Sequence, residues 1–315
     1  MSPLDISIHK TLSYFSLFNY PLTKEELFAY LWQPEKINFE EFVLALRNED
    51  EKFGHYFSLP ENIEQRRARL VTTEHKMKIA RRAARLIRAV PFLRAIFVCN
   101  SVGEGIAKEG SDIDFFIITA PKRIWLVRFF TNLILKLFRL RTYGKNSRDK
   151  ICLSFYVDEN NLNLWPLRAL DEDVHFVYWL HQMVPLFDPR NLYAKFISAN
   201  DWTKKFAPNI TRKSASKYLS AVKDSSFARV WRKVWETMWQ GAYGNFLESQ
   251  VKSIQTQMFK DVLKNRAKEN DNGVVISDTV LKFHENDTRR KIYEEWKEKC
   301  TKYENYERCE NIFVS

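Results

Sequence analysis

The 315-residue sequence contains little glycine and proline, with eight and ten residues respectively. So little glycine excludes a collagen-like chain and disfavours an all-β protein, which needs many tight turns. The four cysteines show no C-x-x-C spacing, so neither a zinc site nor a disulfide framework is indicated. These absences favour a mostly helical protein with few sharp turns.

Long uncharged runs are also missing. The most apolar stretch, residues 124–140, is interrupted by Arg128, Asn132, Lys136 and Arg139, whereas a membrane-spanning helix needs about 20 nearly uncharged residues. The first ten residues lack the apolar core of a secretion signal. We therefore expect a soluble cytoplasmic protein that has no membrane partner.

Hydrophobic residues and positive charge are abundant. Hydrophobic residues make up 45% of the chain, enough for a buried core, and the net charge is +11. Residues 61–94 contain ten basic and three acidic residues, and residues 121–150 contain nine basic and one acidic residue. Such clusters suggest a local field for phosphates, nucleic acid or an anionic surface, although two solvated helix faces would give the same pattern.

Residues 1–60 show the pattern of a winged-helix-like module. Capping boxes at Thr23–Glu26 and Asn38–Glu41 begin the second and third of three predicted helices. A short strand is predicted at 55–59. The third helix, 39–52, has a net charge of −3 and is therefore unsuited to lie against DNA phosphates. A role in protein packing is favoured over DNA binding.

The rest of the chain predicts a small mixed sheet followed by helices. One or two helices are predicted over 62–90, and an amphipathic helix over 124–140. Strands are predicted at 94–99, 113–119 and 150–158, with a short one at 274–276. Further helices are predicted at 171–184, 213–247, 251–268 and 288–304. The predicted class is α+β, with an N-terminal module at 1–60, a core with its leading helices at 61–165 and a helical region at 166–315.

Two aspartates at the start of a predicted strand indicate chemistry. Asp112 and Asp114 are two positions apart, so their side chains lie on the same face of the strand. Paired carboxylates are poor core residues, and a hard divalent cation compensates their charge. The turn at Asn100 and Ser101, before a short helical segment, can offer backbone N–H groups to a phosphate. A metal on one side and donors on the other suit phosphoryl or nucleotidyl transfer.

The whole stretch from the first strand to the second resembles the signature of the DNA polymerase beta-like nucleotidyltransferase superfamily. That signature is matched by Ser101, by Gly105 four positions later, and by the run Ser111-Asp112-Ile113-Asp114. The resemblance implies a nucleotidyltransferase core in which Asp112 and Asp114 bind Mg²⁺ or Mn²⁺. It also implies that Asn100, Ser101, Gly105 and Ser111 form the site of a nucleoside triphosphate, whose α-phosphate is attacked by an acceptor.

The chain departs from this signature at two places. Asn100 stands where the family has a glycine, and asparagine tolerates positive φ better than most residues. The third carboxylate of active members is expected on the strand at 150–158, where the mid-strand position holds Ser154. Asp158 is predicted on the same face as Ser154, but about 13 Å further along the strand.

These features lead to two main hypotheses. The first is a metal-dependent enzyme that transfers a nucleoside monophosphate from a nucleoside triphosphate to an unknown acceptor. The basic clusters at 61–94 and 121–150 make RNA the leading anionic acceptor if they converge around the site. The second is a catalytically degenerate relative that binds nucleotide or nucleic acid as a regulator. A DNA-binding regulator that uses residues 1–60 is the third reading.

Overall fold

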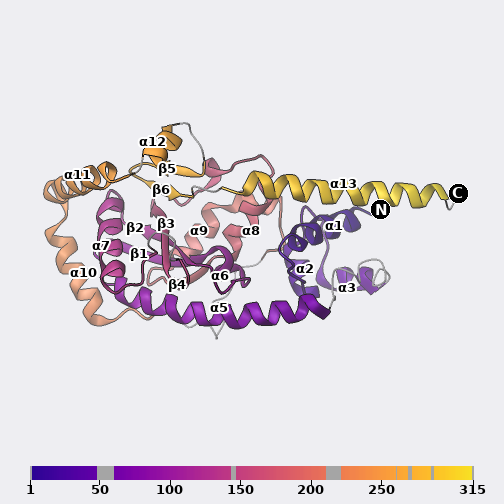
Figure 1. Ribbon diagram of the computed structural model, residues 1–315, viewed down its shortest axis with the longest axis horizontal. Helices are drawn as coiled ribbons and strands as arrows, with labels where there is room; N and C mark the ends of the chain where they lie inside the picture. Colours follow the sequence, from indigo (N-terminus) through magenta and orange to yellow (C-terminus); the bar gives the residue numbers. More distant parts are fainter. Residues whose placement is uncertain are drawn as a thin grey trace.

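A six-stranded mixed sheet forms the centre of the molecule and has the strand order β4-β1-β2-β3-β6-β5 (Figure 1). The computed structural model describes residues 2–47, 60–142, 147–210, 221–259, 261–268, 272–284 and 287–313. The strands are β1 (Leu93–Cys99), β2 (Ile113–Thr119), β3 (Ile151–Asp158), β4 (Val184–Phe187), β5 (Val274–Ile276) and β6 (Val280–Phe283). β2 and β3 are parallel, and the other neighbours are antiparallel. The α+β class is confirmed, as are the strands predicted for β1, β2, β3 and β5.

Helices cover both faces of this sheet. α5 (Pro60–Ile87) and α7 (Ile124–Leu137) lie on one face, and α8 (Val174–Gln182) and α9 (Leu192–Ala199) lie on the other (Figure 1). β2 is buried on both sides, because Ile113, Phe115 and Ile117 point toward α5 and α7, whereas Phe116 and Ile118 point toward α8 and α9. A strand buried on both faces reads as a continuous apolar run, and this run placed β2 correctly from the sequence.

The three N-terminal helices are α1 (Pro3–Ser16), α2 (Lys24–Tyr30) and α3 (Phe39–Arg47). The capping boxes predicted at Thr23 and Asn38 are present, each with both reciprocal hydrogen bonds. The apolar faces of these helices form one core with α8 and with α13 (Arg289–Phe313), in which Trp32 packs against Trp296 with ring centroids 5.6 Å apart. The strand predicted at 55–59 and the end of the third predicted helix lie outside the described residues.

Several predicted boundaries in the C-terminal half were wrong. The helix predicted at 213–247 is divided, in its described part, into α10 (Ser226–Met238) and the start of α11 (Gly241–Gln257), because Gly241 adopts a positive φ of 64° at the break. α11 then runs through the predicted boundary at 247–251, and α12 (Asp261–Lys268) follows it. The prediction missed α9, β4 and β6. β4 and β6 are four-residue strands whose pairing with β1 and β3 comes from tertiary contacts.

The amphipathic helix predicted over 124–140 ends earlier than expected. α7 stops at Leu137, and Arg139 adopts a positive φ of 56°, so that the N–H of Leu140 donates to the carbonyl of Leu135. Within the described parts of the chain, none of the helices combines the length and apolarity that crossing a membrane requires.

Candidate functional site

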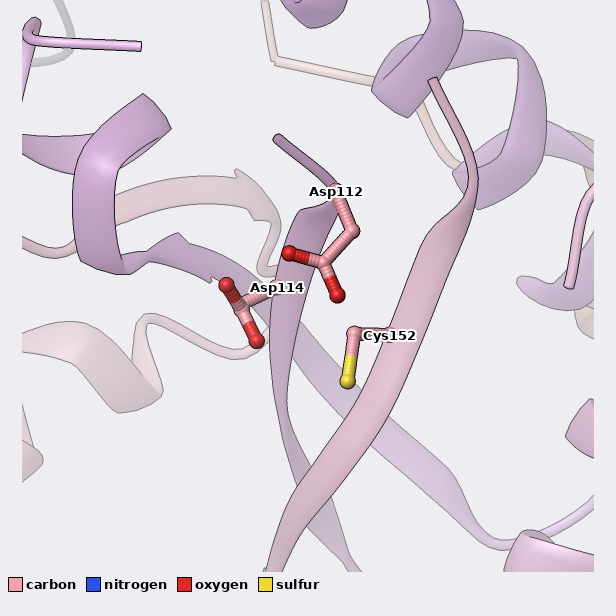
Figure 2. A group of neighbouring side chains, drawn as sticks. All are labelled: Asp112, Asp114 and Cys152. Carbon is pink, nitrogen blue, oxygen red and sulfur yellow. The ribbon is translucent and has the colours of Figure 1, made fainter. Parts of the chain in front are cut away.

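The two aspartates of the sequence motif lie together at the start of β2, and a cysteine from β3 lies beside them (Figure 2). Carboxylate oxygens of Asp112 and Asp114 and the Sγ atom of Cys152 all lie within 4.8 Å of one another. The parallel register explains the third member, because Asp114 is directly opposite Cys152 on the neighbouring strand. The predicted pair is therefore confirmed as a cluster, and it has a thiol as its third side chain.

Alternation in the sequence predicted Cys152 and Ser154 on one face of this strand, and the mid-strand member, Ser154, was expected at the third position. Asp114 is opposite Cys152 but Phe116 is opposite Phe155, so β3 has one extra residue between the two pairs. Beyond the bulge the alternation is inverted: Phe155 points toward α8, and Tyr156 points toward α7. Cys152, opposite Asp114, is the third corner, and the neighbouring Ser154 hydroxyl bonds to Asp114 and lies 3.1 Å from Nε2 of His284.

Asp158, the other candidate for the third carboxylate, lies at the far end of β3. It is opposite Thr119, the last residue of β2, whereas the cluster lies at the first residues of that strand. Its carboxylate accepts hydrogen bonds from the backbone N–H of Asn160 at 2.9 Å and from the side-chain amide of Asn161 at 2.8 Å. Asp158 therefore caps the turn after β3 and takes no part in the cluster.

The carboxylate pair has no cationic partner among the described residues; Asp114 is buried and Asp112 is partly exposed. Burial, and secondly the charge of Asp112, raise the pKa of Asp114 to about 7. Hydrogen bonds from Asn100, Cys152 and Ser154 lower it only in part. Neither Asp112 nor Asp114 forms an ion pair with a residue in the described ranges. Burial and the two carboxylates also raise the pKa of the Cys152 thiol to about 12, so this side chain is neutral at pH 7.

The raised pKa of Asp114 predicts a pH-dependent gain in stability for Asp114→Asn. Because the folded-state pKa lies above the ordinary value, the free energy of unfolding falls as pH rises from about 4 to about 7; the cost is complete above pH 7 and nearly absent at pH 4. In chelator-treated protein we expect the variant to gain roughly 2–4 kcal/mol in free energy of unfolding at pH 8.5 and almost nothing at pH 4. Urea titrations of both proteins, with the exposed Asp171→Asn as control, measure this difference. An equal gain at both pH values would contradict it.

The turn that precedes the carboxylates is built around Asn100. This residue begins α6 (Asn100–Glu104) with a positive φ of 53°, a conformation that asparagine adopts more readily than most residues. Its side-chain oxygen accepts a hydrogen bond of 2.6 Å from the indole of Trp179, and the side chain also bonds to Asp114. Asn100 is therefore turned onto the carboxylate pair. At the other end of α6, Gly105 ends the helix with a φ of 82°.

These residues open into a cleft of about 630 Å³. Of the residues predicted from the sequence, Asn100, Ser101, Asp112 and Asp114 line it, and Gly105 and Ser111 do not. The Ser111 hydroxyl donates to the carbonyl of Lys108 and so closes the turn before the carboxylates. The opposite wall of the cleft consists of the aromatic and titratable side chains Phe155, His175, Phe176, Trp179, Lys282, His284, Asp287 and Arg289.

Sequence reasoning missed this opposite wall. Lys282 donates to the carbonyl of Asn272 and to Asp287, and burial lowers its pKa to about 8. Burial lowers the pKa of His284 to about 4, so its ring is neutral at pH 7. Arg289 forms ion pairs with Asp173 and Asp287. No local signal marks these residues, because β6 is short and joins β3 only through tertiary pairing.

The two basic segments do not converge on the cleft. Among the described residues that line it, none comes from 61–94 or 121–150. Arg88 instead donates to the carbonyl of Lys223 beside α10, and part of the second segment lines a separate groove on the other face of the sheet. The condition under which the basic segments made RNA the leading acceptor, their convergence around the site, is therefore not met, and the charge reason for an RNA acceptor at the site is lost.

The donor set of the cluster fits a divalent cation. The two carboxylates line an accessible cleft and have no cationic partner in the described structure. Mg²⁺ or Mn²⁺ would compensate their negative charge. A neutral thiol at the third corner supplies a weaker donor for a hard ion than a carboxylate would. No family model matches the chain, and no curated protein or solved structure matches it either.

Proposed function

We propose that this chain is a nucleotidyltransferase-type protein that binds a nucleoside triphosphate together with Mg²⁺ or Mn²⁺ at Asp112 and Asp114. The observation that supports this best is the carboxylate pair, buried Asp114 and partly exposed Asp112, which has no cationic partner in the described structure and lies beside the Asn100–Ser101 turn in one cleft. A cleft of about 630 Å³ is in the usual range for a small-molecule ligand. The signature quoted from the sequence adds the reaction class, transfer of a nucleoside monophosphate to an acceptor.

In this proposal each side chain has a separate task. Asp112 and Asp114 would hold the cation, which when bound would neutralise both carboxylates and polarise a phosphoryl oxygen. Asn100 orients Asp114 through its side chain, and Trp179 fixes Asn100 in turn. Ser101 lies at the cleft wall, where its hydroxyl can donate to a phosphate oxygen. The neutral ring of His284 lines the cleft and lies 3.1 Å from the hydroxyl of Ser154.

A nucleotide-binding regulator is the second candidate. Cys152 at the third corner favours it, because a thiol with a pKa near 12 is neither an anion for a second cation nor a base at neutral pH. Such a site would keep Mg²⁺-dependent nucleotide binding and lose most of the turnover. The two candidates therefore share the binding step and differ in the chemical step.

The binding step is tested by calorimetry with nucleoside triphosphates in the presence and absence of Mg²⁺ or Mn²⁺. We expect the metal to tighten binding at least about tenfold in the wild type, and Asp112→Asn/Asp114→Asn to remove this difference. Asp158→Asn is the matched control, because it changes an aspartate of the neighbouring strand that lies outside the cluster. Equal metal dependence in the wild type and the double variant would overturn the proposal.

Release of pyrophosphate then separates the two candidates. Wild-type protein, mixed nucleoside triphosphates and Mg²⁺ or Mn²⁺ are assayed with RNA, protein and small hydroxyl compounds as acceptors. Turnover that disappears in the double variant supports the enzyme. Metal-dependent binding without turnover supports the regulator.

A further inference from the structure

A groove of about 750 Å³ lies beside α7, on the face of the sheet opposite α8. It runs between α7, the end of α11 and the start of β3. The side chains that line it include five cations: Arg128, Lys136, Arg139, Arg141 and Lys150. The lining contains no aspartate or glutamate, and none of the five forms an ion pair with any other part of the chain that the structure describes. The groove therefore offers positive charge that the described protein leaves uncompensated.

Two of these cations are held in fixed positions. Arg141 donates through Nε to the side-chain oxygen of Asn132 at 2.8 Å and through a terminal nitrogen to the carbonyl of Ile151 at 3.1 Å. The guanidinium of Arg128 lies over the rings of Phe259 and Phe283, with its central carbon 5.0 and 4.8 Å from their centroids. The buried Nε of Arg128 has no hydrogen-bond partner among the described residues. Guanidinium groups fixed in this way are suited to an oxyanion such as a phosphate.

The neutral polar side chains of the groove are already engaged within the protein. The side-chain amide of Asn132 donates to the carbonyl of Arg128, and its oxygen accepts from Arg141. Gln255 donates to the carbonyl of Trp125 and accepts from Arg128. The groove therefore has charge for an anion but few free amides with which to read the edge of a nucleic acid base.

The rim of the groove is aliphatic and exposed. Leu133 and Leu137 are one turn apart on α7, and Leu137 is 76% exposed. Ile254 and Met258 are one turn apart at the end of α11, and Met258 is 78% exposed. Leu133 and Met258 also line the groove itself. Helices that lie in the interface of a bilayer combine exposed aliphatic side chains with basic ones in this way.

We propose that this groove binds the phosphate headgroup of an anionic phospholipid, with the rim of Leu133, Leu137, Ile254 and Met258 inserted among the acyl chains. Charge complementarity identifies the anion, because five cations surround the groove and carboxylates are absent from its lining. The four exposed aliphatic side chains favour a lipid over a nucleic acid, because bases stack on exposed aromatic rings, and of the two rings in the lining Phe259 is buried and Phe129 is only partly exposed. The chain would then bind a membrane surface from one side.

Cosedimentation of the full chain with vesicles tests this proposal. We expect binding to phosphatidylcholine vesicles that contain about 30% phosphatidylglycerol, and at least about tenfold weaker binding to pure phosphatidylcholine. Leu137→Glu/Met258→Glu and, separately, Lys136→Glu/Arg139→Glu should each weaken the binding about tenfold or more. Val71→Glu and Lys78→Glu are matched controls, because both positions are exposed on α5 and distant from the groove lining. Circular dichroism verifies that every variant is folded.

Three results would overturn the proposal. The first is the same weak binding to both kinds of vesicle. The second is an equal loss of binding in the α5 controls and the groove variants. The third is tight binding of a single-stranded RNA, lost in the groove variants, together with no binding to vesicles. That result would identify the occupant of the groove as nucleic acid. None of these measurements involves Asp112 or Asp114, so they are independent of the proposed nucleotide site.

Discussion

Cys152→Asp should tighten the binding of Mn²⁺ or Mg²⁺ at the carboxylate cluster by about 10–100-fold. The thiol lies within 4.8 Å of both carboxylates but is neutral, because its pKa is raised to about 12. A third carboxylate at this corner adds an anion close to the cation, and even at an effective dielectric constant of about 20 such a charge contributes several kcal/mol before desolvation is subtracted. Manganese binding followed by electron paramagnetic resonance measures the change.

Two other substitutions make this expectation specific. Cys152→Ser exchanges one neutral donor for another and should leave the affinity within about threefold of the wild type. Ser154→Asp places the new charge beside Asp114 and His284 but outside the Asp112, Asp114 and Cys152 cluster, and it should gain less than Cys152→Asp. If Ser154→Asp gained the larger affinity, the assignment of the third corner to Cys152 would be wrong. Pyrophosphate release that rises only in Cys152→Asp would show that the missing anion limits turnover.

Lys76→Met should lower the free energy of unfolding by about 3 kcal/mol or more. The Lys76 side chain is fully buried in α5, and its Nζ donates to the carbonyls of Glu109 and Ser111 and to the carboxylate of Asp149. Removing the ammonium leaves two carbonyls without their buried donor, and it leaves Asp149, whose side chain is 30% exposed, with a longer contact to Arg148 at 3.8 Å. Guanidinium denaturation of the metal-free protein measures the loss.

The same lysine fixes the chain directly before Asp112. Because the carbonyl of Ser111 is one of its acceptors, Lys76→Met should also weaken metal binding under conditions in which the variant is still folded. The control is Lys78→Met on the same helix, since Lys78 is exposed and has only a surface ion pair with Glu74. Its unfolding free energy should change by less than about 0.5 kcal/mol. Similar losses in both variants would assign the effect to helix α5 in general and contradict a specific role for Lys76.

Local patterns in the sequence were sufficient for the elements that build the cluster. The apolar runs before and after the motif predicted β1, β2 and β3, and the spacing of Asp112 and Asp114 predicted that they share a face. The capping boxes at Thr23 and Asn38 predicted helix starts that the hydrogen bonds confirm. These features depend on residues close together in the chain, so the sequence contains their cause directly.

The rest of the fold and of the candidate site depends on contacts between segments that are distant in the sequence. Alternation predicted Cys152 and Ser154 on one face and the mid-strand position favoured Ser154, whereas the pairing of β2 with β3 puts Cys152 opposite Asp114. Charge clustering grouped residues 61–94 with 121–150 at the cleft, yet the sheet separates the cleft from the basic groove. Lys282 and His284 reach the cleft only because β6 pairs with β3, more than 120 positions earlier. A single sequence gives no local sign of these pairings.

The packing of α13 against α1 affects how the protein is made. The indole of Trp296 donates to the carbonyl of Lys10 at 2.8 Å across 286 positions of sequence, and Lys299 donates to Ser16 nearby. A ribosome that adds about 5–20 residues per second reaches Trp296 roughly 15–60 s after it has synthesised α1. During that interval the apolar faces of the N-terminal helices have no α13 to cover them, so the nascent chain is a natural client for chaperones that hold exposed hydrophobic segments until translation ends.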